Sequence, residues 1–217
     1  MNPEAQYLWH TTPLFYLPHL LQTGAIYSAR EIAARGLPVR PRPSAIRRKT
    51  RLGLADFVHL SPQAVTPLLR DKLEKGYAHV LIAFRRADVL RLPGACLLRY
   101  NTKRWAHRDD FLPVTDAEEM ATVWAEHDAG RFPSLEILVP GSLSLSLADA
   151  VHVRADDEGR LLQALVSALA LPVPTVCLSL ELFSPCDAPA NLEAVREYFA
   201  GCESAARVLD PPALPFD

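Results

Sequence analysis

Apolar and polar residues near the start of the chain follow the periods of short strands and helices. In residues 8–28 an apolar run reaches His10, leucines recur at helical spacing, and Gly24 precedes a second apolar pair. This pattern predicts a strand, a short helix ending at Gly24 and another extended segment. We expect His10 at the end of a buried strand, where it either faces a ligand cleft or serves as a core histidine bonded to a carbonyl.

In the rest of the chain, apolar residues again follow the spacing of strands in some segments and of helices in others. The most continuous apolar run, Tyr77 to Phe84, predicts the central strand. Further strands are predicted over 57–60, 96–100, 135–140, 151–153 and 175–183, and helices over 29–34, 63–75, 116–127, 160–170 and 191–207. Three prolines, at 38, 41 and 43, predict an irregular loop that carries the arginines after them. The fold class is therefore α+β.

Length and composition indicate a folded globule. The chain has 217 residues, 49% of them hydrophobic and 22% charged, enough for one sizeable core. We expect a core in residues 1–149 and a C-terminal extension in 150–217, with a single domain as the alternative. The longest apolar run, residues 161–176, is interrupted by polar residues and prolines, so no membrane span is expected. Four scattered cysteines without a CxxC pair predict reduced thiols, no metal site and a cytoplasmic protein.

The overall charge excludes a general attraction to nucleic acid. Lys and Arg number 23 against 25 Asp and Glu, a net charge of -2. One local basic cluster stands out between Glu31 and Asp56, which contains no acidic residue. Its members are Arg40, Arg42, Arg47, Arg48, Lys49 and Arg51. Such a run is either a solvated segment or a patch that binds anions.

One carboxylate lies in an otherwise apolar strand. Glu136 stands at the start of the run Leu135 to Pro140. A buried carboxylate is costly unless another group pairs with it. Glu136 is therefore either a strand-edge residue bonded to a lysine or arginine, or a catalytic residue.

The order of these features resembles the ADP-ribosyltransferases, and more closely the DarT-type family that modifies single-stranded DNA. The resemblance covers roughly the first 145 residues. It depends on Leu8-Trp9-His10-Thr11-Thr12 and the following segment 17–24, on Ala45-Ile46-Arg47-Arg48, on Ala55-Asp56-Phe57-Val58, and on Leu135-Glu136-Ile137-Leu138-Val139-Pro140.

This resemblance implies a fold of mostly antiparallel sheets around an NAD cleft, with peripheral helices. It implies that Glu136 is the catalytic glutamate, and that Arg48 or its neighbour anchors NAD and helps to remove a proton from the attacking base. The residues that it places at the co-substrate NAD are His10, Thr11, Thr12, Tyr27, Ser28, Arg47 and Arg51. An aromatic wall for nicotinamide would come from Tyr27, Phe57 or Tyr77.

Two departures from the family pattern leave one assignment open. The family's Tyr-Val-Pro-Phe-Tyr-Phe appears here as Phe57-Val58-His59-Leu60-Ser61-Pro62, and the loop before it is short. The sequence therefore does not decide among Arg47, Arg48 and Arg51.

The chemistry explains why these residue types belong together. Loss of nicotinamide leaves an oxocarbenium-like ribose, which a carboxylate stabilises, and guanidinium groups suit a pyrophosphate. A DNA base must be unpaired to react. The segment with Arg104, Trp105, His107 and Arg108 is a candidate to hold a single strand.

The sequence is compatible with three functions. The first is NAD-dependent ADP-ribosylation of a base of single-stranded DNA by a toxin or phage-defence enzyme, with an antitoxin as possible partner. The second changes the acceptor to RNA, protein or a small molecule. The third is an inactive module that binds a nucleotide or a partner.

Overall fold

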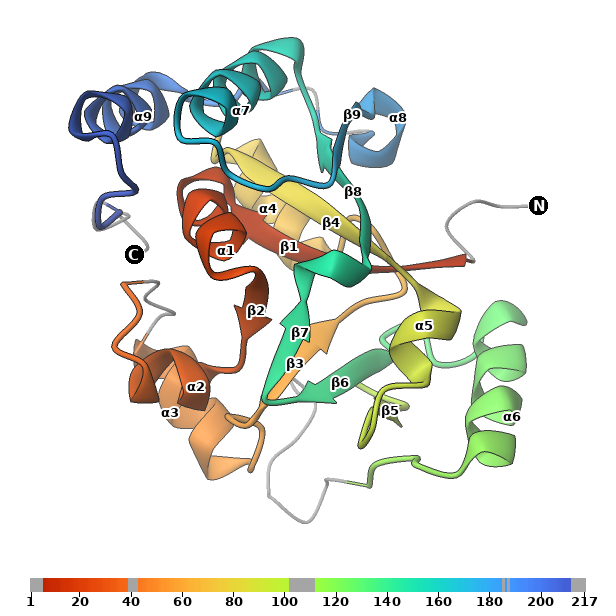
Figure 1. Cartoon of the computed structure of the whole chain (residues 1–217). Helices are drawn as coiled ribbons and strands as arrows, with labels where there is room; N and C mark the ends of the chain where they lie inside the picture. The colour runs from red at the N-terminus through yellow and green to blue at the C-terminus, as the bar shows by residue number, and fades with distance from the viewer. Residues whose placement is uncertain (1–5, 39–42, 102–111, 185, 187, 212–217) are drawn as a thin grey trace. The chain divides into compact units, whose positions relative to one another are not determined.

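The computed structural model describes residues 6–38, 43–101, 112–184, 186 and 188–211. The chain forms two compact units, each built from separate stretches (Figure 1). Unit 1 comprises residues 1–8, 26–62 and 85–143, and unit 2 comprises 9–25, 63–84 and 144–217. The sequence-based boundary after residue 149 stays a prediction.

Unit 1 contains a three-stranded antiparallel sheet in the order β3-β6-β5. Its strands are β3 (Phe57–Leu60), β6 (Glu136–Pro140) and β5 (Cys96–Leu98), close to the strands that the sequence predicts. The register places His59 opposite Leu138 and Leu98 opposite Glu136. Glu136, the first residue of the central strand, therefore lies diagonally across from His59 on the same face.

That face of the sheet is apolar apart from these two residues. Leu52 and Leu54 form a buried cluster with Cys96, Leu98 and Leu138, and Phe57 packs against it. The other face is also buried, through Val58, Leu60, Leu97, Ile137 and Val139. Coverage on both faces explains why the strand at 135–140 is almost continuously apolar.

The arginine-rich segment is a helix, so the predicted loop over residues 43–51 was wrong. Helix α3 runs from Pro43 to Arg51. Proline is well tolerated in the first turn of a helix, because the first backbone N–H groups have no intrahelical partner. The following alanine, isoleucine, arginines and lysine favour the helical state more than the nearby prolines oppose it.

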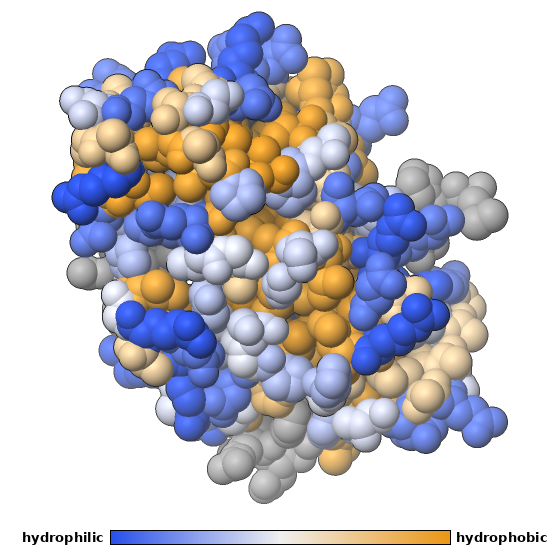
Figure 2. Space-filling view, viewed as in Figure 1, coloured by the Kyte–Doolittle hydropathy of each residue, from blue (hydrophilic) through white to orange (hydrophobic). Residues whose placement is uncertain are grey.

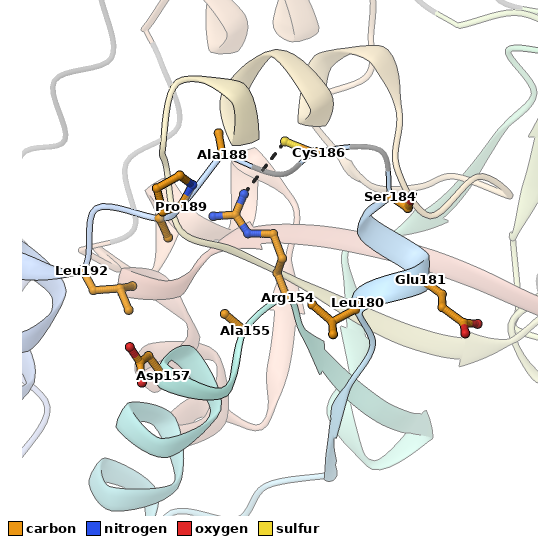
Figure 3. A pocket seen from close by; sticks show the side chains of 11 residues that line it. Arg154, Ala155, Asp157, Leu180, Glu181, Ser184, Cys186, Ala188, Pro189 and Leu192 are labelled. Carbon is orange, nitrogen blue, oxygen red and sulfur yellow. Dashed lines mark hydrogen bonds between the residues drawn. The ribbon is translucent and has the colours of Figure 1, made fainter.

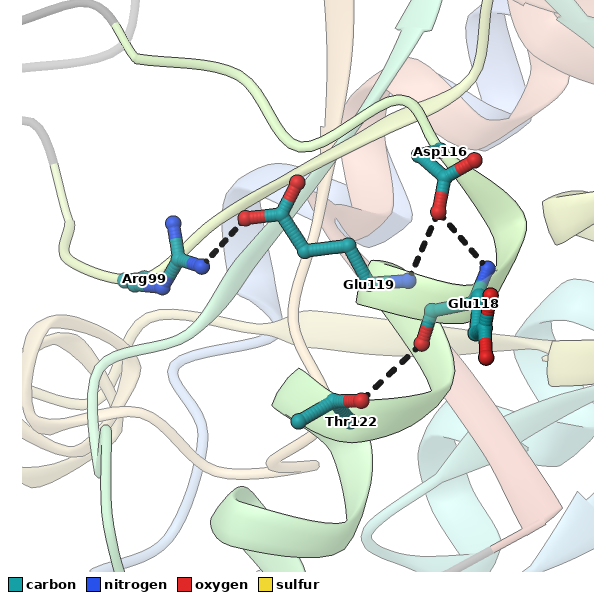
Figure 4. A network of polar contacts seen from close by, with 5 residues as sticks. All are labelled: Arg99, Asp116, Glu118, Glu119 and Thr122. Carbon is teal, nitrogen blue, oxygen red and sulfur yellow. Dashed lines mark hydrogen bonds and ion pairs between the residues drawn. The ribbon is translucent and has the colours of Figure 1, made fainter.

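Three further helices lie within the described residues of unit 1. Helix α2 (Ala29–Ala34) begins after Ser28, α5 spans Arg86–Leu90 and α6 spans Ala117–Asp128. The Asp116 carboxylate accepts hydrogen bonds from the backbone N–H groups of Glu118 and Glu119, at 3.0 and 2.9 Å (Figure 4). Arg99, just after β5, pairs with Glu119 at 2.6 Å and so ties α6 to the sheet. Strand β2 (Ala25–Tyr27) pairs with β7 (Ser142–Ser144).

Unit 2 contains a four-stranded sheet in the order β1-β4-β8-β9. The strands are β1 (Tyr7–Pro13), β4 (His79–Arg85), β8 (Ala148–Val153) and β9 (Thr175–Leu178). β4 and β8 are antiparallel, whereas β8 and β9 are parallel. Residues 79–84 are all buried, which confirms the predicted central strand. The strand predicted over 175–183 is shorter than expected, because Leu180–Phe183 forms helix α8.

Besides α8, unit 2 contains the helices η2 (Leu14–Tyr16), α1 (Leu17–Thr23), α4 (Pro67–Glu74), η5 (Leu145–Leu147), α7 (Asp156–Ala168) and α9 (Glu193–Ala205). The four longest of them lie close to predicted helices, and α7 packs on β8 and β9. α1 ends at Gly24, whose left-handed φ of 69° favours glycine. In Figure 2, hydrophilic residues cover the upper margin where α7 lies, and apolar residues reach the surface beneath them. Among the described residues, no helix has the length and apolar character needed to span a bilayer.

A buried ion pair closes the start of α7. Glu158 is fully buried and Arg154 is 5% exposed. The Glu158 carboxylate accepts hydrogen bonds from the backbone N–H groups of Arg154 and Ala155, at 2.9 and 3.2 Å. It thereby satisfies donors at the helix N-terminus, while the Arg154 guanidinium lies 3.8 Å away.

Candidate active site

The candidate site of unit 1 is built around the carboxylate of Glu136. His59 Nδ1 lies 2.9 Å from Glu136 Oε1, and the two side chains are only 13% and 14% exposed. Glu136 Oε2 is buried and has no hydrogen-bond partner among the described residues. Such an oxygen can still accept a hydrogen bond, for example from a ribose hydroxyl.

The amine of Lys49, on α3, is also near this carboxylate. Burial lowers the pKa of Lys49, and the negative charge of Glu136 raises it by a smaller amount. Because such an electrostatic effect requires proximity, helix α3 brings a partly buried ammonium group to the glutamate. The site therefore combines one carboxylate with an imidazole and an amine.

The three candidate arginines occupy two different environments on α3. Arg47 and Arg51, one helical turn apart, are exposed. Arg48 is half-buried, and its Nε atom is buried. Arg48 thus shares with Lys49 the partly buried side of the helix in the unit that holds Glu136. Their predicted roles at NAD stay predictions.

Two predicted site residues of unit 1 have contacts within the fold. Ser28 is 1% exposed, and its hydroxyl accepts a hydrogen bond from the backbone N–H of Glu31 at 3.3 Å. It is therefore the N-cap of α2. Tyr27 is half-buried, with the Arg35 guanidinium 4.6 Å from its ring centroid. Their predicted contact with NAD is not tested by these interactions.

The remaining predicted site residues, His10, Thr11 and Thr12, lie on β1 in unit 2. Thr12 is 5% exposed, His10 is half-buried and Thr11 is exposed. The Thr11 hydroxyl lies 3.5 Å from Nδ1 of His79 on β4. Burial lowers the pKa of His79 to about 3, with smaller effects of Lys72 and Arg154 in the same direction. His79 is therefore a neutral core histidine near neutral pH.

Unit 2 also contains a cavity of about 670 Å³ between the start of α7 and α8. Figure 3 shows Arg154 directed toward Cys186 within its lining, and the Arg154 Nη1 to Cys186 Sγ distance is 3.9 Å. None of the site residues predicted from the sequence lines this cavity.

The last sequence predictions for the site concern the candidate single-strand segment and metal ligands. The segment with Arg104, Trp105, His107 and Arg108, proposed to hold a single strand, lies outside the described residues. Within the described part of the chain, no three His, Cys, Asp or Glu side chains are grouped so as to hold a metal ion. The four cysteines are free thiols.

Sequence reasoning missed His59 and Lys49. His59 was visible only as a departure from the family pattern, and Lys49 was one cation within a basic run. The available signal was alternation, since Phe57 and His59 share one face of a strand and the neighbouring strand carries a lone glutamate. Neither of these two strand sequences by itself specifies the register in which the strands pair.

The fold is similar to solved structures of DarT. Thermus sp. 2.9 DarT in complex with ADP-ribosylated ssDNA matches with a TM-score of 0.62 and 16% identity, over 83% of this chain and 97% of that one. The same enzyme in complex with NAD+ matches with a TM-score of 0.61 and 16% identity, over 84% and 99% of the two chains. Thermosipho africanus DarTG in complex with ADP-ribose matches with a TM-score of 0.61 and 18% identity, over 82% of this chain and 51% of that one.

No protein-family model matches the sequence, and no curated protein matches it. The structural similarity nevertheless spans both units and nearly the full length of the Thermus protein. The chain therefore has a DarT-like ADP-ribosyltransferase fold, as the sequence predicted, with mixed α/β architecture and mostly antiparallel sheets.

Proposed function

We propose that this protein is an NAD-dependent ADP-ribosyltransferase that modifies a base of single-stranded DNA. The observation that carries the proposal is the buried carboxylate of Glu136, one oxygen of which has no hydrogen-bond partner among the described residues, in a fold similar to DarT bound to NAD+ and to ADP-ribosylated ssDNA. A toxin with an antitoxin partner is consistent with the similarity to DarTG.

The residues present suit NAD as a co-substrate. NAD supplies an ADP-ribosyl group with nicotinamide as leaving group. The free oxygen of Glu136 would accept a hydrogen bond from a ribose hydroxyl, and its charge would stabilise the positive charge that develops on the ribose. Arg48 would contact the pyrophosphate, with Arg47 and Arg51 as alternatives.

The predicted adenosine contacts complete the proposal for NAD. These are His10, Thr11 and Thr12 on β1, together with Tyr27 and Ser28. In the overall reaction the bond between ribose and nicotinamide breaks and a bond from ribose to a base nitrogen forms. The base loses the proton that this nitrogen carried, and this proton passes to water. Arg48 would help its removal by stabilising the negative charge that develops on the base, since a guanidinium is already protonated and cannot itself accept the proton.

Mass spectrometry of oligonucleotides after incubation with NAD tests this function. We expect single-stranded DNA to gain the mass of one ADP-ribose, with release of one nicotinamide. Glu136→Gln should lower the rate at least about 100-fold, because it removes the charge that stabilises the developing cation. Glu119→Gln is the matched control, since Glu119 is an exposed partner of Arg99 on α6.

Other outcomes would identify other functions. Label on RNA, on protein or on a small molecule alone would move the acceptor to that class. Absence of nicotinamide release with every acceptor and at every protein concentration would contradict the enzyme and favour a binding module.

A further inference from the structure

The Glu136 carboxylate is held by a residue from the neighbouring strand. His59 on β3 and Glu136 on β6 are diagonal neighbours on one face of the sheet, and Nδ1 of His59 is 2.9 Å from Oε1 of Glu136. The rest of that face is covered by Leu52 and Leu54. At 13% and 14% exposure, both side chains are largely protected from water, so their hydrogen bond is stronger than one at the surface.

The surroundings of the imidazole determine which nitrogen carries a proton. Nδ1 faces the Glu136 carboxylate, and Nε2 lies 3.4 Å from the backbone carbonyl of Leu54. Both neighbours accept hydrogen bonds, so the doubly protonated ring satisfies both. When the ring is neutral, the shorter contact with a charged acceptor keeps the proton on Nδ1.

A lysine near the pair acts on the carboxylate without a direct contact. Lys49 on α3 attracts Glu136 electrostatically, but no hydrogen bond or ion pair between them is found in the described structure. His59 is therefore the described side chain that fixes the orientation of the carboxylate. Because one carboxylate oxygen accepts from His59, the other remains available and is held in a defined direction.

We infer that His59 is the positioning residue for Glu136, and that its Nδ1–H group orients the carboxylate toward the reacting ribose. This inference rests on the proposed function. It assigns to His59 an effect on the chemical step, and little effect on the binding of NAD, since His59 acts through Glu136.

Three substitutions of His59 separate positioning from packing. The amide nitrogen of asparagine lies near the position of the histidine Nδ1, whereas that of glutamine lies near the position of Nε2. His59→Asn should therefore keep most of kcat. His59→Gln and His59→Leu should lower kcat at least about tenfold with KM for NAD nearly unchanged, as expected for loss of a hydrogen bond to a charged group.

Nicotinamide release at varied NAD concentration gives these constants, and thermal melting shows whether each variant is folded. The inference is overturned if folded His59→Leu retains wild-type kcat, or if His59→Asn loses as much kcat as His59→Leu. If wild type itself releases no nicotinamide, the proposed function fails instead, so the two failures are distinguishable.

Nitrogen-15 NMR of the imidazole tests the pairing without turnover. At high pH we expect His59 of the wild type to carry its proton on Nδ1. In Glu136→Leu the ring should revert to the Nε2–H form, which is the commoner tautomer of free histidine. An Nε2–H ring in the wild type would contradict the inferred contact.

Discussion

At the scale of single residues, burial decides the behaviour of the titratable groups. Burial lowers the pKa of His19, His79 and His152, and it raises the pKa of the Cys96 thiol to about 11. Each shift favours the neutral form, as expected where a charge loses its hydration. Glu136 is also largely shielded from water, and two neighbouring elements bring His59 and Lys49 near its carboxylate.

The lowered pKa of His79 predicts a loss of stability in acid. The unfolded chain binds a proton below about 6.5, whereas the folded protein resists it until about 3. The free energy of unfolding should therefore fall as the pH decreases through this window, by up to about 1.4 kcal/mol per pH unit. Urea denaturation at a series of pH values measures this slope. His79→Leu should flatten it, and an equally steep dependence in that variant would refute the assignment.

At the scale of elements, local sequence patterns predicted most helices and strands close to where the structure has them. Gly24 ends α1 as predicted, and Asp116 and Pro67 stand at the starts of α6 and α4, helices that the apolar periodicity predicted. Helix α3 shows where such signals fail, because neighbouring prolines suggested a loop although Pro43 is compatible with a first turn. Strand β9 ended early for a similar reason, since an apolar run of this length suits either a strand or a short helix.

The cap of α6 offers a direct test of one such signal. Asp116→Ala removes two hydrogen bonds to backbone N–H groups and should lower the free energy of unfolding by about 1 kcal/mol. Asp116→Asn should lose much less. Thr122→Ala is the control, since its hydroxyl bonds a carbonyl that already belongs to the same helix. Equal stability of Asp116→Ala and wild type in urea would contradict the role of the cap.

At the scale of the whole molecule, each unit is assembled from stretches far apart in the sequence. Strand β4 in the middle of the chain pairs with β8, through Leu81 with His152 and Ile82 with Val151. β8 begins at Ala148, so a chain ending at residue 149 would lack most of it together with β9, α7 and α9. The buried backbone of β4 would then lose one of its two neighbouring strands and keep only β1.

A truncated chain of residues 1–149 therefore should not unfold cooperatively, whereas the full chain should. Thermal melting followed by circular dichroism distinguishes the two. A cooperative transition for 1–149 near that of the full chain would instead support the division that the sequence suggested.

The sequence by itself determined the alternation of helices and strands, the central strand and the choice of Glu136 as a candidate catalytic residue. Periodicity, helix caps and a lone charge in an apolar run are local properties, so a single segment is enough to reveal them. The partner of Glu136 was decided only by the tertiary structure. His59 lies 77 residues away in the chain, and the register of β3 against β6 brings it to 2.9 Å. Strand register depends on the packing of both faces at once, which no single segment encodes.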